Sequence, residues 1–206
     1  MAFGELQTRW RQALLLPDLQ AMAVQVQTHV PAAAARVLVG FSGGKDSTAL
    51  ALAAAVAARE RALQITLVHI NHQLQSDAPL WVEQCRKVAA GAGIELVIRD
   101  VDVVPAGMGL EAAARAARYA AIAQLMHSGD VVLTAHHQRD QAETVLLRLL
   151  RGAGIDGLGA MRHCQRFGTG WLSRPLLGVS AQRLSDVIQA SGLPWIDDPS
   201  NADTDL

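Results

Sequence analysis

The chain has 206 residues, of which 50% are hydrophobic and 18% are charged, and its formal net charge is −1. These values are typical of one large globular domain, or of one domain and the beginning of a second. The near-zero charge gives no bulk attraction to nucleic acid, so a polyanionic partner would need local basic patches or another domain. The two cysteines, Cys85 and Cys164, form no CxxC pair and suggest neither a disulfide framework nor a four-cysteine zinc site.

Membrane insertion and export are not indicated by the sequence. The longest strongly apolar run without a charge, residues 48–58, is too short to span a bilayer. Glu5 and Arg9 lie where a signal peptide would need its apolar core. We therefore expect a cytoplasmic protein without a membrane anchor.

Short runs rich in valine, isoleucine and leucine alternate with longer segments of helical composition. The runs predict β-strands at residues 36–41, 65–71, 95–102 and 131–137. The helical segments are residues 47–61, 79–92, 110–127 and 140–151. This alternation predicts an α/β fold, a doubly wound and mainly parallel sheet with helices on both faces. Ligands of such sheets bind beyond the carboxyl ends of the strands, so the residues after each strand are the candidates for function.

A glycine-rich turn follows the first predicted strand and precedes a helix. Its residues are Ser42, Gly43, Gly44, Lys45, Asp46 and Ser47. Glycines allow a sharp turn with exposed N–H groups, and the helix N-terminus adds partial positive charge, so the turn suits a phosphate group. An ordinary strand-to-helix turn capped by Asp46 or Ser47 is the alternative. A Walker A loop is disfavoured because Gly40 and Gly44 enclose three residues instead of four.

A second polar cluster follows the fourth predicted strand, at His136, His137, Asp140 and Glu143. Adjacent histidines on a strand point to opposite faces and no HExxH spacing is present, so a zinc site is disfavoured. Asp140 and Glu143 are three residues apart and can share a face at the start of a helix. Carboxylates are favourable there whatever their function, so helix capping is the alternative to a binding role.

Two arginine pairs are further candidates for contact with an anion. Arg115 and Arg118 are three residues apart on one predicted helix and could clamp a phosphate, although a charged stripe is also typical of a solvent face. Arg148 and Arg151 lie where another helix meets a glycine-containing loop, and the alternative there is a basic C-terminal cap.

The hexapeptide at residues 42–47 resembles the SGGxDS pyrophosphate loop of the PP-loop ATP pyrophosphatases, which cleave ATP between its α and β phosphates. Further segments occur in the order seen in the tRNA(Ile)-lysidine synthetase family. They are HINHQL (69–74), GLEAAARAARY (109–119), TAHHQRDQAETVLLRLLRGAGIDGL (134–158), RPLL (174–177) and WIDDPSN (195–201). The resemblance extends over residues 36–201, and six ordered segments are far more specific than the loop alone.

The resemblance implies an ATP-dependent ligase. In that family free L-lysine is joined to C2 of the wobble cytidine of tRNA(Ile) with the CAU anticodon, through an adenylated cytidine, with release of AMP and pyrophosphate. ATP and Mg²⁺ are the implied cofactors, and a homodimer is a possible assembly. We expect a helical lead-in at residues 1–30 and a PP-loop catalytic domain at residues 31–206, with the family's C-terminal tRNA-binding domains absent.

The resemblance also implies a role for each candidate residue. The loop, residues 42–47, would bind ATP; Lys45, Asp46, Asp140 and Glu143 would be catalytic, and Asp46 and Asp140 would hold magnesium. The implied substrate-binding residues are Arg115, Arg118, His136, Arg148 and Arg151. Arg139 departs from the family, which commonly has an acidic residue there. We predict that its side chain faces solvent or pairs outside the site.

Two other classes of protein are alternatives. A tRNA thiolase of the same superfamily would use the same adenylation, but it generally needs a reactive cysteine pair or a cluster site, whereas Cys85 lies within a predicted helix and Cys164 stands alone. A non-catalytic nucleotide-binding module would need neither the acidic cluster nor the arginines.

Overall fold

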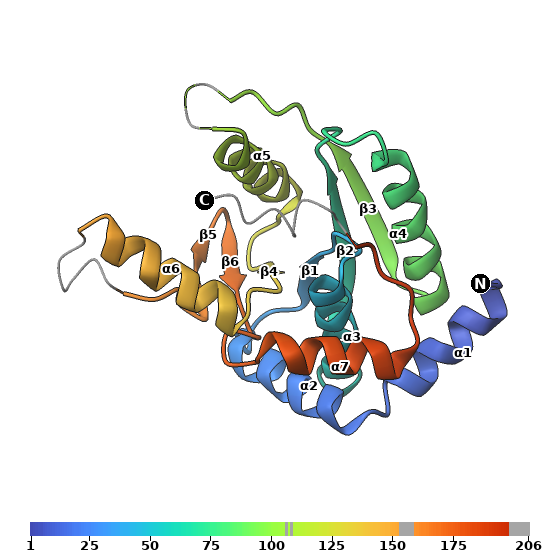
Figure 1. The fold of residues 1–206 in the computed structure, drawn as a ribbon. Helices are drawn as coiled ribbons and strands as arrows, with labels where there is room; N and C mark the ends of the chain where they lie inside the picture. Colours follow the sequence, from blue (N-terminus) through green and yellow to red (C-terminus); the bar gives the residue numbers. More distant parts are fainter. Residues whose placement is uncertain (106, 108, 153–158, 198–206) are drawn as a thin grey trace.

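A six-stranded sheet forms the centre of the computed structural model, which describes residues 1–105, 107, 109–152 and 159–197 (Figure 1). The strands are β1 (Arg36–Gly40), β2 (Gln64–Asn71), β3 (Glu95–Asp100), β4 (Val131–Leu133), β5 (Cys164–Phe167) and β6 (Gly170–Ser173). Their order is β3-β2-β1-β4-β6-β5, and only β5 runs antiparallel to its neighbour. This arrangement confirms the predicted doubly wound, mainly parallel sheet.

Seven helices lie around this sheet in the described part of the chain. They are α1 (Phe3–Ala13), α2 (Pro17–His29), α3 (Lys45–Arg61), α4 (Ala78–Ala92), α5 (Leu110–Leu125), α6 (Gln138–Leu150) and α7 (Ala181–Ser191). None of the helices within the described residues is long and apolar enough to cross a membrane.

Both faces of the sheet are covered, as the continuous apolar strands predict. Along β1, Val37 and Val39 belong to the larger core cluster, with α1, α2, α3, α4 and α7, whereas Leu38 belongs to the smaller cluster with Ile122 of α5. The alternation follows from the two-residue period of a strand, whose successive side chains point to opposite faces. Helix α6 has no buried residue and extends outward from the sheet (Figure 1).

Helix α3 is apolar on nearly all sides, which explains its alanine-rich sequence. Residues from Ala49 to Ala53 are fully buried, and the helix contacts α2 and α7 as well as the sheet. Small alanine side chains let these neighbours approach closely, and a helix that is hydrophobic all round belongs in a core. The burial of α3 therefore fixes the position of its N-terminus, where the glycine-rich turn lies.

The predicted boundary at the end of the fourth strand was wrong. We expected strand to residue 137, but β4 ends at Leu133 and helix α6 already begins at Gln138. Thr134 continues the ladder by one bond, from its N–H to the Ser173 carbonyl at 3.0 Å, and the chain then turns so that His137 becomes the N-cap of α6. Capping geometry therefore overrides the apolar pattern here.

A partly buried ion pair joins the amino ends of the two central strands. Arg36 is the first residue of β1. Its Nε lies 3.1 Å from both carboxylate oxygens of Asp130, whose side chain is 6% exposed. Burial alone would raise the pKa of Asp130, but hydrogen bonds from Arg36 and from the His127 N–H outweigh it and lower that pKa. The starts of β1 and β4 are thereby held together.

We expect Arg36→Met to destabilise the chain by about 3 kcal/mol, because the carboxylate of Asp130 would stay buried without its partner. Arg183→Met is the matched control: Arg183 pairs with Asp18 at 2.6 Å, but both side chains are about half exposed, at 47% and 54%. A loss of at most about 1 kcal/mol is expected for that exposed pair. Urea unfolding measures both values, and equal losses would show that the Arg36 pair is not special.

Candidate functional site

The glycine-rich turn connects β1 to α3 and leaves the first helical N–H groups without a side-chain cap. The N-cap is Gly44, which has no side chain to accept a bond, so neither Asp46 nor Ser47 caps the helix. The two serine hydroxyls, Ser42 Oγ and Ser47 Oγ, lie 3.1 Å apart, and Ser47 Oγ donates to the Gly44 carbonyl at 3.0 Å. The start of a helix with unsatisfied N–H donors is an anion site, which supports the phosphate reading over the simple turn.

Gly43 is packed so tightly that only glycine fits. Its φ is +84°, and a Cβ there would lie 2.5 Å from Cδ1 of Ile196 and 2.9 Å from Sγ of Cys85. The Ile196 N–H donates to the Gly43 carbonyl at 2.8 Å. The segment after α7 therefore closes against the loop, a contact that the sequence analysis did not predict even though this segment is one of the quoted motifs.

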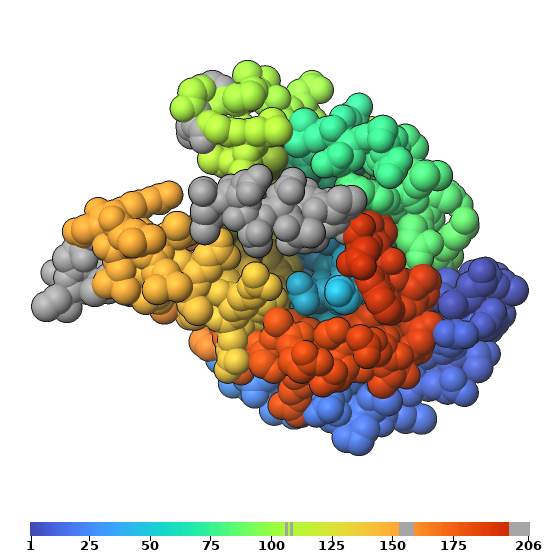
Figure 2. Space-filling view, in the orientation of Figure 1, coloured from blue at the N-terminus to red at the C-terminus, as the bar shows by residue number. Residues whose placement is uncertain are grey.

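Figure 2 shows the light-blue start of α3 at the bottom of a hollow bordered by the yellow segment after β4 and the red segment around and after α7. Lys45 lies at this border, with its Nζ 3.8 Å from Oδ1 of Asp197, and both side chains are substantially exposed. Among the described residues, the glycine-rich loop and the segment after β4 therefore both border this hollow. Residues 153–158 and 198–201 of the quoted motifs lie outside the described part of the chain.

His137 links the two clusters that the sequence analysis placed on different strand ends. Its Nε2 lies 3.6 Å from Oδ2 of Asp46, and its Nδ1 lies 3.3 Å from Oδ2 of Asp140. The nearby side chain of Asp46, and then the charge of Asp140, raise the pKa of His137 despite its burial. This contact forms because β1 and β4 are neighbouring parallel strands, so the segments that follow them leave the sheet side by side. The loop and the second cluster therefore meet beyond the carboxyl ends of these two strands.

Asp140 has a structural role in addition to any binding role. Its Oδ2 accepts a bond from the His137 N–H at 2.7 Å, and His137 Nδ1 accepts from the Arg139 N–H at 3.1 Å, which together make a capping box. Helix capping, left open by the sequence, is therefore real for Asp140. His137 received no role from the sequence; its position three residues before an aspartate at a helix start is the pattern that could have indicated one.

His136 differs electrostatically from its neighbour. Thr134 Oγ1 holds its Nδ1 at 2.9 Å, and the ring is half-buried. Burial lowers the pKa of His136 to about 4; Asp140 opposes this shift, whereas Arg115, Arg174 and Arg118 add to it. His136 is thus neutral at neutral pH and lies beside a group of positive charges, of which Arg174 was given no role by the sequence.

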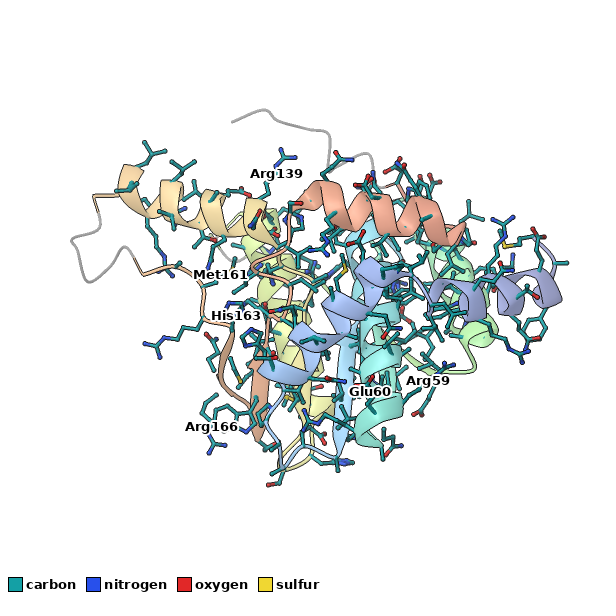
Figure 3. The ribbon with its side chains drawn as sticks, turned by 90° about the horizontal axis from the view of Figure 1, so that it is seen from below. Arg59, Glu60, Arg139, Met161, His163 and Arg166 are labelled. Atoms are coloured by element: carbon teal, nitrogen blue, oxygen red, sulfur yellow. The ribbon has the colours of Figure 1, made fainter. Side chains whose placement is uncertain are left out.

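Of the remaining candidates, Glu143, Arg139 and Arg151 are exposed and Arg148 is half-buried. The Glu143 side chain makes no hydrogen bond or ion pair with another described residue. Arg139 points away from the body of the molecule (Figure 3), which confirms the prediction that it faces solvent. Arg148 and Arg151 lie at the far end of α6, which extends outward, so they do not adjoin the loop (Figure 1). The structure therefore unites the loop with Asp140 and His136, but not with the second arginine pair.

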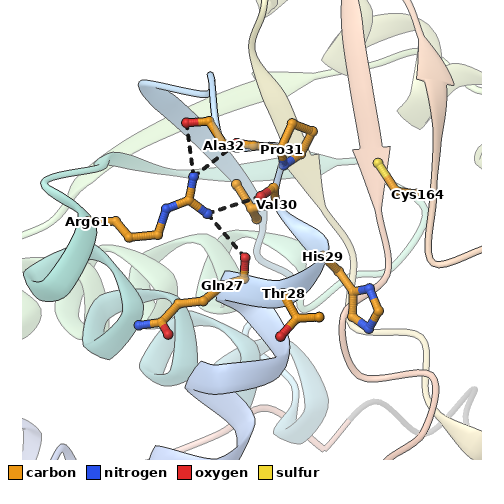
Figure 4. A pocket seen from close by; sticks show the side chains of 8 residues that line it. All are labelled: Gln27, Thr28, His29, Val30, Pro31, Ala32, Arg61 and Cys164. Atoms are coloured by element: carbon orange, nitrogen blue, oxygen red, sulfur yellow. Dashed lines mark hydrogen bonds between the residues drawn. The ribbon is translucent and has the colours of Figure 1, made fainter.

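A cavity of about 570 Å³ lies away from this site, at the opposite end of α3. Its lining is Gln27, Thr28, His29, Val30, Pro31, Ala32, Arg61 and Cys164 (Figure 4). Arg61 donates to four backbone carbonyls between Gln27 and Ala32. Its donors serve to tie the end of α2 to the end of α3, and the cavity plays no part in the site described above.

The parallel sheet, the uncapped glycine loop and the polar strand ends together define an α/β domain built to bind an anion at its topological switch point. The profile of the PP-loop domain family matches residues 17–206, and the chain belongs to this family.

The relatives with established names agree with the resemblance found in the sequence. The tRNA(Ile)-lysidine synthase of Pseudomonas syringae pv. tomato is 49% identical over 166 residues, which cover 80% of this chain and 37% of the relative. That of Xanthomonas campestris pv. campestris is 50% identical over 172 residues, or 82% of this chain and 39% of the relative. The chain therefore spans about two-fifths of the length of these relatives.

Among solved structures, a U34-tRNA thiolase from Methanococcus maripaludis has a similar fold. The TM-score is 0.70 at 14% sequence identity, and the match covers 87% of this chain and 65% of the thiolase. At this identity the likeness shows the fold alone.

We expect Gly43→Ala to lower the stability of the chain by roughly 2–5 kcal/mol, from left-handed backbone strain and the clash with Ile196. Two controls separate the causes. Gly93→Ala has a similar φ of +67° in open space and should lose only about 1–2 kcal/mol. Gly44→Ala has no positive φ and its nearest neighbour would lie at 3.5 Å, so it should fold normally. Thermal unfolding of the three variants measures this, and an unaffected Gly43→Ala would refute the tight packing.

Proposed function

We propose that this chain carries the chemistry of tRNA(Ile)-lysidine synthesis: ATP-dependent ligation of L-lysine to C2 of the wobble cytidine of tRNA(Ile), with release of AMP and pyrophosphate. The observation that carries the proposal is the position of His137 between Asp46 and Asp140. It brings the glycine-rich loop, which we expect to bind ATP, next to the polar cluster at the start of α6. It is supported by relatives with this activity in their names that are 43–50% identical.

The loop would bind the triphosphate of ATP. The N–H groups of the first turn of α3 have no intrahelical acceptor, and the Lys45 ammonium adds a mobile positive charge at the edge of the hollow. Charge accumulates on the leaving pyrophosphate as the bond between the α and β phosphates breaks, so donors already oriented there stabilise the transition state. Transfer of AMP to the C2 oxygen of cytidine converts a poor leaving group into a phosphate ester that can depart.

Asp46 and Asp140 fit a magnesium ion in number and in chemistry. Mg²⁺ is usually held by one or two carboxylates together with phosphate oxygens of the substrate. Each aspartate has its Oδ2 near His137, and no hydrogen bond within the described residues involves the Oδ1 of either one. No group of three or more metal-binding side chains occurs in the described part of the chain, so substrate oxygens would complete the coordination. When bound, the ion would neutralise the phosphates.

Lysine would be recognised by Asp140 and Glu143. A free amine with a pKa near 10.4 is mostly protonated at neutral pH, so the site must first bind an ammonium and then let it lose a proton. Glu143 follows Asp140 by three residues on α6, and its carboxylate is exposed and unpaired among the described residues. Arg139 faces solvent, although its charge still acts on His137 and lowers the pKa of that residue slightly against the effect of the carboxylates.

The RNA would meet the basic side of the site. Arg115 and Arg118 on α5, with neutral His136, would bind the cytidine nucleotide, and Arg148 and Arg151 on the projecting α6 would contact the tRNA further out. In this proposal residues 31–206 are the PP-loop catalytic domain behind the helical lead-in, and the reaction is cytoplasmic.

The thiolase alternative is disfavoured by the state of the two cysteines. Cys85 is fully buried, and burial raises the pKa of its thiol to about 12, so it is not a nucleophile at neutral pH. Cys164 lies at the start of β5, and burial raises its pKa as well. Neither cysteine has the thiolate character that sulfur transfer requires.

The proposed function is tested by pyrophosphate release from ATP and Mg²⁺ with the chain, tRNA(Ile) and lysine. We expect release to need both substrates, with labelled lysine entering the tRNA. Release stimulated by a sulfide donor would favour a thiolase, and ATP binding without release under any condition would favour a non-catalytic nucleotide module. Calorimetry with ATP and Mg²⁺ provides the baseline for binding.

We expect Glu143→Gln to reduce lysine-dependent turnover by at least about tenfold, since the lost carboxylate serves the ammonium. Folding and ATP affinity should be unchanged because the Glu143 side chain makes no hydrogen bond or ion pair with another described residue. The matched control is Glu83→Gln on α4, an exposed glutamate paired only with Lys87. Unchanged turnover in Glu143→Gln, or an equal loss in the control, would return Glu143 to the solvent-exposed helix face.

A further inference from the structure

Arg174 emerges from the sheet at the same edge as the proposed site. It directly follows β6, which runs parallel to β4 with Ser173 opposite Leu133. The Thr134 N–H donates to the Ser173 carbonyl at 3.0 Å, and Thr134 in turn holds His136. The end of β6 is therefore joined to the segment that carries both histidines of the site, although about forty residues separate them in the sequence.

The Arg174 guanidinium is buried and has no counter-ion among the residues that the structure describes. The residue is 6% exposed, its Nη1 donates to the Arg162 carbonyl at 3.2 Å, and its Nε has no hydrogen-bond partner. No carboxylate lies within 4 Å of its nitrogen atoms in the described ranges of the chain. Arg36, in contrast, is more exposed and is fully paired with Asp130. Burying a charge without a partner is costly, so Arg174 is arranged for an anion that the described part of the chain does not supply.

The surroundings of Arg174 are positively charged. Together with Arg115 and Arg118 it lowers the pKa of neighbouring His136 in addition to the effect of burial, so the three guanidinium groups act on one place. Arg115 and Arg118 are exposed on α5, whereas Arg174 is buried at the carboxyl end of β6. Asp140 is the one negative charge that opposes them at His136 among the described residues.

We propose that Arg174 binds a phosphate group of the substrate at the floor of the site, with Arg115 and Arg118 closing over the same group from α5. A guanidinium presents a planar fork of donors that matches a phosphate, and the unpartnered Nε is one prong of that fork. The phosphate belongs either to ATP, at its α position, or to the RNA chain beside the reacting cytidine. That the phosphate comes from ATP or from RNA rests on the proposed function. That Arg174 binds a phosphate group does not.

The test compares the wild-type chain with Arg174→Gln by calorimetry, in one arm with ATP and Mg²⁺ and in the other with a single-stranded RNA of the anticodon-loop sequence. We expect affinity to fall by about tenfold or more in the arm that carries the bound phosphate. If that arm is the RNA, its salt dependence should also lose a slope of about 0.7. The control, Arg166→Gln, removes an exposed guanidinium that lies 4.0 Å from the Trp171 ring centroid and should bind both ligands normally (Figure 3).

A second measurement covers the case in which Arg174→Gln does not fold. The Nε–H signal of Arg174 in the wild-type NMR spectrum, assigned by its absence in Arg174→Lys, should shift when the bound phosphate carrier is added. Unchanged affinity in both arms for a folded Arg174→Gln, or an Nε–H signal that neither ligand moves, would overturn the proposal. Both readouts omit lysine and turnover, so a failure of the ligase assay would leave this test intact.

Discussion

The parallel pairing of β1 with β4 is the constraint on which the site depends. The sheet is built outward from this pair, with β2 and β3 on one side and β6 and β5 on the other, so the connections leave in opposite directions and expose the strand ends between them. Arg36 and Asp130 hold the amino ends of the pair, and Asp46 and His137 meet beyond its carboxyl ends. Every other feature of the site is placed relative to these two strands.

The two adjacent histidines separate the site into an acidic and a basic side. His137 lies between two carboxylates and its pKa is raised, first by the side chain of Asp46. The pKa of His136 is lowered, first by burial and then by nearby guanidinium groups. Two neighbouring histidines therefore lie in different electrostatic surroundings, one dominated by carboxylates and the other by burial and guanidinium groups.

The rigidity of the loop comes from packing on both of its sides. The burial of α3 fixes the helix start, and Ile196 and Cys85 leave no space at Gly43 for a side chain. A phosphate site made of backbone N–H groups works only if those groups are already aligned, because reorganisation would consume binding energy. The same packing explains the buried, unreactive state of Cys85, whose thiol fills space under the loop.

Local patterns in the sequence determined the elements whose signal is local: the apolar strands β1, β2 and β3, the alanine-rich α3 and the glycine loop between strand and helix. They also placed Asp140 at the start of a helix, although α6 begins two residues earlier, at Gln138. The end of β4 at Leu133 and the contact of His137 with Asp140 follow from a local capping box that the apolar pattern hid. The tertiary structure alone decided that His137 meets Asp46, that Ile196 closes against Gly43, and that Arg174 is buried without a counter-ion among the described residues. These three features depend on contacts between residues far apart in the chain, and charge compensation and close packing are properties of such contacts, which no local pattern contains.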